Sequence, residues 1–294
     1  MLYEQIAQNK RKTMLLVTLF TILVLAIGWA IGYLFGHSPW TSLVVTLIIL
    51  AIYVPITFMS ANSQVLSMSG AKEVTSDDYP ELVNIVEELS IAARIPKPKI
   101  HVIEEASPNA FATGIKPEKG SVAVTTGLLD KLNREELSGV IAHELGHIRN
   151  YDIRLMTICI ALVGVIVVIA QFGSHMLLFS GGRGDNQKRN PLLMIVALVL
   201  VILAPLAAQF VRLAVSRNRE YLADATSVEL TRNPAGMISA LKKISGDSND
   251  VERADDATAA MYIDVPRKKN RKKRGSLWAT HPTIESRIEK LQEM

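Results

Sequence analysis

The sequence predicts a mainly α-helical protein with a small β-sheet, in which four transmembrane helices are joined to a polar domain. Four long apolar runs free of Asp, Glu, Lys and Arg support the transmembrane part, because a helix needs ~20 such residues to cross the hydrocarbon of a bilayer. Short β-type segments between the second and third runs support the sheet. We expect the runs to pair as two hairpins, each followed by a polar segment.

The composition excludes several other classes of protein. The chain has 294 residues, of which 49% are hydrophobic and 20% charged, and its mean hydropathy is +0.24. It is too apolar for an intrinsically disordered protein or a coiled coil, and its one cysteine, Cys159, excludes an intrachain disulfide. The tract at 267–274 holds seven basic residues, so the net charge of +4 leaves −3 (+4 minus 7) for the rest. We therefore expect no nucleic-acid partner.

The first two apolar runs are expected to form an N-terminal transmembrane hairpin within residues 1–62. They cover residues 14–35 and 40–58, which are 22 and 19 residues long. A cleaved signal peptide is the alternative for the first run, but its apolar core would span ~7–15 residues and end at a small-residue cleavage site. The run is longer than that and lacks such a site.

The third and fourth runs are expected to form a second transmembrane hairpin over residues 155–211. Neither 155–182 nor 190–211 holds an Asp, Glu, Lys or Arg, and the polar, glycine-rich tip at 181–186 reads as the loop between them. A buried helical hairpin in a soluble core is the alternative, although buried soluble helices are seldom so apolar over ~20 residues.

Basic residues beside the apolar runs predict the orientation, because cytoplasmic flanks of membrane proteins are enriched in Lys and Arg. Residues 10–12 are all basic and precede the first run, and three arginines follow the last run (Arg212, Arg217, Arg219). The loop between the third and fourth runs also holds three basic residues, which is a contrary signal. We expect a multi-pass protein of the plasma membrane, with both termini and residues 60–152 in the cytoplasm.

The first polar segment, within residues 63–154, has the pattern of a small α/β unit. Residues 77–93 have helical spacing, with Asp78 as a candidate cap. A later helix should begin at Asn133, because Asn133 and Glu136 form a capping-box pattern. Three short strands are expected between these helices (98–103, 110–113, 121–126).

The second polar segment, residues 212–294, is expected to be helical in three places. A helix over 211–230 follows the last apolar run, and Asn233 should cap a second helix that ends at Ile244. Residues 245–274 are partly disordered by composition. A short charged helix is expected at 283–291.

The most informative residues are His143, Glu144 and His147, which form an HExxH sequence in the middle of the helix that begins at Asn133. Histidines at i and i+4 lie one turn apart on one helix face, so both imidazoles can bind one metal ion. The glutamate between them can take a proton from an attacking water molecule. Two imidazoles and one carboxylate suit zinc, with a fourth position open for water. The pattern predicts a metal hydrolase rather than a chance pair of surface histidines.

A third protein ligand is expected from the second polar segment. His147 lies eight residues before the third apolar run and Glu220 nine residues after the fourth, so continuing helices would bring both to ~12–14 Å above the membrane edge. Glu220 and Asp224 share one helix face at i and i+4. One of them can bind the metal while the other holds a ligand histidine through its free ring nitrogen. The spacing alone leaves both assignments open.

Together these residues resemble a known family, the integral-membrane zinc metalloproteases of the HtpX and CAAX-prenyl-endopeptidase group. The resemblance covers essentially the whole chain, and its length and four expected spans fit the bacterial heat-shock branch of that group. It implies a cytoplasmic zincin-like metalloprotease domain built from residues 63–154 and 212–294, with one zinc ion per subunit. It rests on HELGH followed by Asp152, on EYLAD at 220–224, on Thr280-His281-Pro282 with Arg287, and on Asn109-Ala110-Phe111-Ala112-Thr113-Gly114.

The resemblance also implies a role for each matching residue near the metal. Glu144 would be the catalytic base, and the zinc ligands would be His143, His147 and Glu220. Asp224 would orient a ligand histidine. The further supporting residues would be Asp152, His281 and Arg287.

The resemblance places a substrate-binding edge strand beside the zinc. An exposed strand edge offers main-chain hydrogen bonds to an extended peptide of almost any sequence, which suits an enzyme that cuts many different proteins. An ordinary edge strand, blunted by its shortness and by Pro108, is the alternative. The residues of this strand are Asn109, Ala110, Phe111 and Ala112.

The expected function is that of a membrane-bound zinc endopeptidase acting on misfolded or damaged membrane proteins, in protein quality control and the stress response. Its partners would be these substrates and the lipid bilayer, and no oligomeric state is predicted.

An intramembrane metalloprotease is one alternative function, but seven charged residues surround the motif between positions 131 and 154, and charges at bilayer depth are costly. A four-span transporter or non-catalytic zinc-binding scaffold is another. The spans hold no obvious ion path, and a hydrolytically dead protein would most simply lack Glu144.

Overall fold

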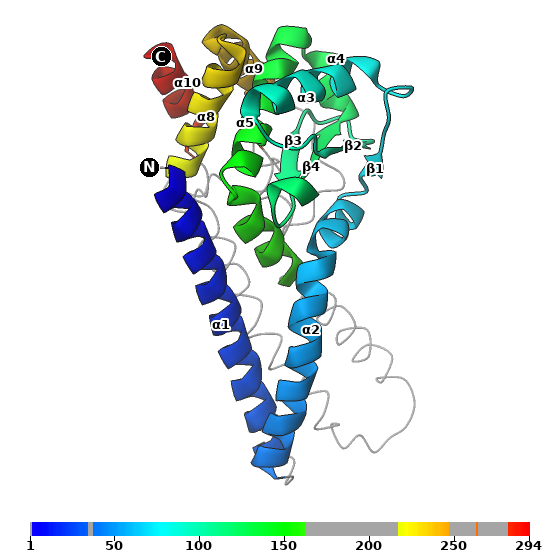
Figure 1. Ribbon diagram of the computed structural model, residues 1–294, viewed down its shortest axis with the longest axis vertical. Coiled ribbons are helices and arrows are strands. Elements are labelled where there is room, and N and C mark those ends of the chain that lie inside the picture. The colour runs from blue at the N-terminus through cyan, green and yellow to red at the C-terminus, as the bar shows by residue number, and fades with distance from the viewer. Residues whose placement is uncertain (1, 35–37, 163–216, 247–262, 264–281) are drawn as a thin grey trace, which may run out of the picture.

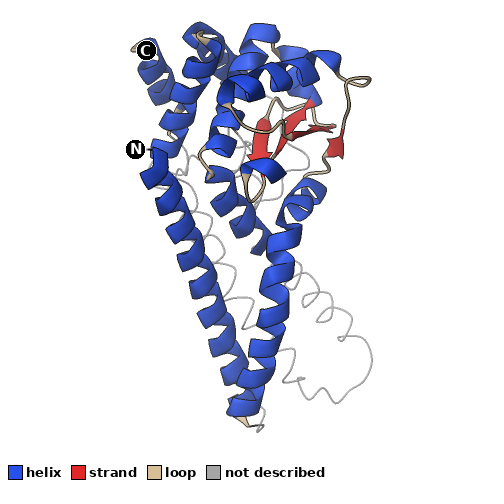
Figure 2. Ribbon diagram, viewed as in Figure 1, coloured by secondary structure: helices blue, strands red, loops and turns tan. Residues whose placement is uncertain are grey.

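The computed structural model describes residues 2–34, 38–162, 217–246, 263 and 282–294. As expected, these residues are mostly helical and form one small four-stranded sheet (Figure 1). Figure 2 shows two long helices that extend away from a domain containing the sheet and the shorter helices. The long helices are α1 (Leu2–Leu34) and α2 (Pro39–Met68).

The helices α1 and α2 contain the first two apolar runs and pack against each other, while their crossing of a membrane as a hairpin remains a prediction. The 30 residues of α2 make a helix of ~45 Å, and within the described ranges it is the one helix found long and apolar enough to cross a membrane. Its large apolar side chains are widely exposed, for example Ile52 at 59% and Met59 at 83%, which favours a hydrophobic surrounding over water. Of the second predicted hairpin, residues 155–162 are helical and 163–211 lie outside the described residues. That pair of spans therefore remains a prediction.

The sheet has the strand order β1-β2-β4-β3. Strands β2 (Lys99–Ile103) and β4 (Ser121–Thr125) are parallel, and the edge strand β3 (Ala110–Thr113) runs antiparallel to β4. These three strands confirm the predicted ones to within one residue at each end. The other edge strand, β1 (Lys72–Glu73), was not predicted, because two residues are too few to show a period.

The helix α5 (Arg134–Arg149) begins where its capping box predicts. The side chain of Asn133 accepts a hydrogen bond from the backbone of Glu136, and the side chain of Glu136 accepts one from the backbone of Asn133, both at 2.9 Å. Before it lies α4 (Thr126–Lys131), a short helix that was not predicted.

The helix α3 (Pro80–Ala93) is confirmed, but the prediction that Asp78 caps it is wrong. Tyr79 occupies the cap position without a side-chain hydrogen bond. The carboxylate of Asp78 instead accepts hydrogen bonds from the backbone N–H and the hydroxyl of Thr75, at 2.9 and 3.0 Å. A local turn therefore competes for the carboxylate that the helix would have used.

Three helices of the second polar segment also agree with the sequence. They are α8 (Arg217–Thr231), α9 (Pro234–Ser245) and α10 (Ile284–Gln292). Asn233 caps α9 through a hydrogen bond from the backbone of Gly236, at 3.1 Å. Most of the segment 245–274, predicted to be partly disordered, lies outside the described residues.

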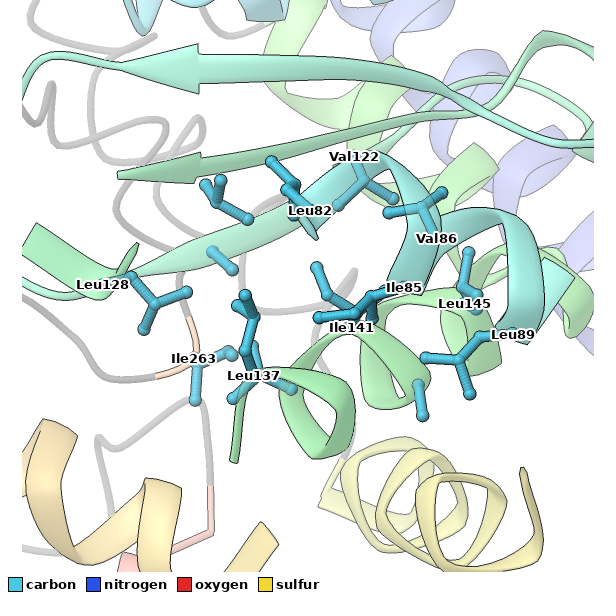
Figure 3. Close-up of a cluster of buried hydrophobic side chains, with 14 of the residues drawn as sticks. Leu82, Ile85, Val86, Leu89, Val122, Leu128, Leu137, Ile141, Leu145 and Ile263 are labelled. Carbon is cyan, nitrogen blue, oxygen red and sulfur yellow. The ribbon is translucent and has the colours of Figure 1, made fainter. Parts of the chain in front are cut away.

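The sheet lies between two clusters of buried apolar side chains. The first cluster joins α3, α5 and α9 to one face, with Ile85, Ile141 and Val122 among its members (Figure 3). The second joins the opposite face to the helices α1 and α2 and to the helical residues 155–162, and includes Leu16 of α1 and Phe111 of β3. The first hairpin helix is therefore packed against the domain.

Candidate metal centre

Three possible metal-ligand atoms converge between α5 and α8. His143 and His147 come from α5 and Glu220 from α8, and one atom from each lies within 4.8 Å of the others. The Nε2 atoms of the two histidines are 3.2 Å apart. Each Nε2 lies 3.7 Å from a carboxylate oxygen of Glu220. Two imidazole nitrogens and one carboxylate oxygen are the donor set that hydrolytic zinc sites use, so the residues fit such an ion.

Small residues allow α8 to approach α5 closely. A Cβ atom on Gly146 would lie only 3.2 Å from Cβ of Thr226, so the fourth position of the motif suits a residue without a side chain. The hydroxyl of Ser227 donates to the backbone oxygen of Gly139 at 2.6 Å, one further tie between these helices. This close contact brings Glu220, in the first turn of α8, to the two histidines.

A different carboxylate lies beside the Nδ1 atom of each histidine. Asp224 Oδ1 lies 2.9 Å from Nδ1 of His143, and Asp152 Oδ2 lies 3.1 Å from Nδ1 of His147. An imidazole that donates its Nδ1 proton to a carboxylate keeps the lone pair of Nε2 free for a metal. Glu220 faces the Nε2 atoms and Asp224 faces an Nδ1 atom, so this geometry favours Glu220 over Asp224 as the metal-binding carboxylate, a choice that spacing alone left open.

A break in the helix brings Asp152 back to His147, five residues earlier. Tyr151 has a φ of 59°, in the left-handed region, and separates α5 from the helical residues 152–162. A side chain larger than glycine adopts this conformation at a cost of ~1–2 kcal/mol. The contact between Asp152 and His147 therefore depends on a locally strained residue that the surrounding packing holds in place.

Arg287 of α10, near the C-terminal end of the chain, lies beside Asp224 and Glu220. Its side chain is 1% exposed, and its Nε and Nη2 atoms donate to the two oxygens of Asp224 at 2.9 and 2.6 Å. Its Nη1 atom lies 4.0 Å from Glu220 Oε2. Arg287 thus lies near the site as the family resemblance implies, whereas His281 lies outside the described residues.

Burial and neighbouring charges shift the pKa values in this site. Burial raises the pKa of Glu144, which is 2% exposed, and a carboxylate with a raised pKa suits proton transfer near neutral pH. Burial and Arg287 lower the pKa of His143, but its bonds to Asp224 and Glu220 outweigh them and raise it to about 9. Burial raises the pKa of Asp224, but the charges and hydrogen bonds of Arg287 and His143 together outweigh burial and lower it.

The predicted substrate strand contacts α5 along the edge of the sheet. The backbone N–H of Thr125 donates to the carbonyl of Asn109 at 2.9 Å, so in the antiparallel register alternate residues of β3 bond to β4. Ala110 and Ala112 consequently direct their N–H groups away from β4. The side chain of Asn109 accepts from the N–H of Ala110 at 3.2 Å.

One buried residue beside the site was not predicted. Arg219, next to Glu220, is 9% exposed, and its Nη1 atom lies 4.0 Å from Asp152 Oδ1. The sequence showed it only as a basic residue that follows the last apolar run, and its burial was not expected because arginines are rarely buried.

A buried HExxH helix, a carboxylate from a second helix and a long apolar helix define a membrane-associated metal-dependent hydrolase. Comparison with known proteins identifies the particular family. The chain belongs to peptidase family M48, whose family model matches residues 76–294. It is therefore a metalloprotease, and the intramembrane and non-catalytic alternatives are not favoured.

Similar proteins share this chain's full length. It is 50% identical over 305 residues to a protein named Protease HtpX homolog from Listeria monocytogenes serotype 4b (strain CLIP80459), and 51% identical over 298 residues to one from Streptococcus agalactiae serotype III (strain NEM316). Each alignment covers 100% of both chains. A crystal structure of S. mikatae Ste24p superposes with a TM-score of 0.48 at 20% sequence identity, covering 98% of this chain and 67% of that one.

Proposed function

We propose that this metalloprotease is a zinc endopeptidase of the plasma membrane that hydrolyses misfolded or damaged membrane proteins. The convergence of His143, His147 and Glu220 within 4.8 Å carries the proposal. The proposed site holds one zinc ion per subunit through His143 Nε2, His147 Nε2 and the carboxylate of Glu220. Asp224 and Asp152 lie beside the Nδ1 atoms of the two histidines. They support this ligand set, because carboxylates that do not bind the metal themselves commonly orient metal-binding imidazoles in this manner.

Each side chain of the site has a different proposed role in peptide hydrolysis. A bound zinc ion supplies a Lewis acid for the peptide carbonyl and for water. Glu144 takes the proton of the attacking water and delivers it to the nitrogen of the leaving amine. Asp224 and Asp152 hold the imidazoles with Nε2 free. Arg287 balances the buried negative charge of Asp224 and Glu220.

The proposed substrate-binding element is the edge strand β3, with Asn109, Ala110, Phe111 and Ala112. Main-chain recognition makes few demands on the sequence of the substrate, which suits damaged proteins of many kinds. Asn109 already occupies the outward N–H of Ala110, so Ala112 supplies the outward donor for an extended peptide.

The proposed topology has four spans, in the two hairpins 1–62 and 155–211. Residues 63–154 and 212–294 together form the cytoplasmic catalytic domain. The packing of α1 against the domain in the second apolar cluster supports a site close to the membrane surface. Such a position gives access to the cytoplasmic parts of membrane proteins.

The test measures zinc content and degradation of an unfolded membrane protein by the purified, detergent-solubilised chain. We expect one zinc ion in the wild type and in Glu144→Gln, with degradation reduced ~10²–10⁴-fold in the variant because it lacks the base. His147→Ala and Glu220→Ala should lose the zinc. A chelator should stop degradation and added zinc restore it. Wild-type degradation by Glu144→Gln, or full zinc content in Glu220→Ala, would refute the proposal.

A further inference from the structure

The edge strand β3 lies between the helix α5 and the start of the third apolar run. Ala110 and Ala112 belong to the first apolar cluster, together with residues of α5. Phe111, between them, is 1% exposed and belongs to the second cluster, together with Leu155. Alternate residues of a strand point to opposite faces, so the two faces of β3 rest on different elements. One of these elements, the helical stretch 155–162, is the expected beginning of a membrane span.

The hydroxyl of Thr157 holds the end of β3. Thr157 is 0% exposed, and its Oγ1 atom accepts a hydrogen bond from the backbone N–H of Gly114 at 2.9 Å. The same oxygen lies 2.9 Å from Oγ1 of Thr113, and either of these two hydroxyls can be the donor. Thr157 therefore bonds both to the last residue of β3 and to the residue that follows it.

The N–H of Gly114 depends on this bond, because the ladder between β3 and β4 ends at the pair Thr113 and Ser121. Gly114 is buried, and a buried N–H without a partner is unfavourable. Its φ of 138° is one that larger residues rarely adopt, and a Cβ atom would lie 2.6 Å from the carbonyl oxygen of Lys119. A larger side chain does not fit at this position, so a neighbouring residue, Thr157, supplies the anchor.

We propose that Thr157 is a positioning residue for peptide binding, which ties β3 to the start of the third apolar run and so fixes the outward N–H of Ala112. The inference rests on the proposed function and deepens it, because it connects the substrate-binding edge to the membrane part of the chain. Gly114 follows Ala112 by two residues, so loss of its bond to Thr157 lets the end of the strand move. Hydrogen bonds weaken steeply with misalignment, so a small displacement of β3 weakens its pairing with a peptide.

Two other roles of Thr157 predict different results. Thr157 shares the helical stretch 152–162 with Asp152, which lies beside the ring of His147. A role that acts through Asp152 predicts weaker zinc binding and a lower kcat. A role in stability alone predicts a lower unfolding temperature and unchanged kinetic constants for the folded enzyme. Positioning of β3 predicts unchanged zinc affinity and a higher KM at constant kcat, because peptide and transition state lose the same binding.

The experiment compares Thr157→Val with the wild type in the full-length, zinc-loaded protein, with a quenched fluorescent peptide long enough to pair along β3. Valine keeps the shape of the side chain and lacks the hydroxyl. We expect a KM that is ~2–10-fold higher, the factor that corresponds to one lost hydrogen bond, with kcat and zinc affinity unchanged. Thr157→Ser keeps the hydroxyl and should restore the wild-type KM.

The matched control is Thr57→Val, which makes the same chemical change at another buried position. Thr57 is 1% exposed, and its hydroxyl donates to the carbonyl of Tyr53 within α2 at 3.0 Å. The control variant should have the KM, kcat and zinc affinity of the wild type. Thermal unfolding shows whether each variant is folded, and Thr157→Ala replaces Thr157→Val if the latter is not.

Two hydroxamate inhibitors provide an independent measurement of binding. Acetohydroxamate chelates the metal and is too small to pair with β3, whereas a hydroxamate joined to a peptide can do both. Thr157→Val should weaken only the peptide hydroxamate, by about the same factor as the KM. An unchanged KM, equal weakening of both inhibitors, or a parallel loss of zinc affinity would overturn the inference. Failure of the proposed function is seen separately, as full zinc content in Glu220→Ala or wild-type turnover by Ala112→Pro.

Discussion

The carboxylate of Asp224 lies 2.9 Å from Nδ1 of His143, so the same side chain that accepts two hydrogen bonds from Arg287 also fixes the ring of a proposed zinc ligand. Glu220, one turn earlier on α8, faces the Nε2 atoms instead. We therefore predict different roles for these two carboxylates on one helix face, and substitutions can distinguish the roles.

Asp224→Asn should weaken zinc binding ~10–100-fold without abolishing it, because the amide accepts the Nδ1 proton less strongly than a carboxylate. Glu220→Gln should reduce bound zinc far more, because it removes a charged ligand. Chelator competition measures the first change and elemental analysis the second. The reverse ranking of the two variants would mean that Asp224, and not Glu220, binds the metal.

Ala112→Pro should severely reduce peptide hydrolysis while the zinc content stays at the wild-type value. Proline removes the one outward N–H of β3 that Asn109 does not occupy, and the ligands on α5 and α8 are untouched. The control is Ala112→Gly, which loses the methyl group and keeps the N–H. Wild-type turnover by folded, zinc-loaded Ala112→Pro protein would exclude β3 as the substrate-binding edge.

Glu136→Gln should lower the stability of the domain at neutral pH by about 1–3 kcal/mol, because the carboxylate accepts bonds from Lys243 at 2.7 Å and Ser239 at 2.6 Å. Burial raises the pKa of Glu136, but these bonds outweigh burial and lower it below the ordinary value of 4.5. A lowered carboxyl pKa contributes stability that is present above pH 4.5 and is lost as the pH falls through the folded value.

Urea unfolding of the metal-free protein at several pH values measures this contribution. The difference between the wild type and Glu136→Gln should shrink as the pH falls below 4.5, the ordinary value. Glu135→Gln is the control, because it removes the same charge from the first turn of α5. An equal loss in both variants would indicate a helix-dipole effect instead of the bonds to α9.

Single-cysteine labelling should place both polar segments in the cytoplasm. In a Cys159→Ala background, Glu118→Cys and Glu293→Cys should react with a membrane-impermeant maleimide only after the cells are permeabilised. Ser38→Cys, in the turn of the first hairpin, should react in intact cells. All three positions are exposed. Labelling of Glu118→Cys from outside would reverse the proposed topology.

Structural features that depend only on residues close together in the sequence were predictable. The helix α5 follows from its capping box and its spacing, and the HExxH pattern places two imidazoles on one turn whatever surrounds them. The prediction for Asp78 was wrong even at short range, because Thr75 offers a competing turn. The equal height of Glu220 and His147 above the membrane predicted that α8 lies near the motif, but it left the choice between Glu220 and Asp224 open.

Features that depend on tertiary packing were not predictable. Strand β1 is two residues long and exists only because Lys72 and Glu73 pair with β2. The burial of Arg219 beside Asp152 arises from the approach of α8 to α5, and no local pattern signals it. The bond from Lys243 to Glu136 joins residues 107 positions apart.

The three converging donors also set an order of events during synthesis. Glu220 follows His147 by 73 positions (220 minus 147), so the ribosome makes both histidines, and then the whole apolar stretch from 155 to 211, before the third donor exists. Two imidazoles alone leave a zinc ion two ligands short of its usual four. The proposed zinc site is therefore incomplete in a nascent chain until Glu220 has been synthesised, so we expect the chain to be inactive before that point.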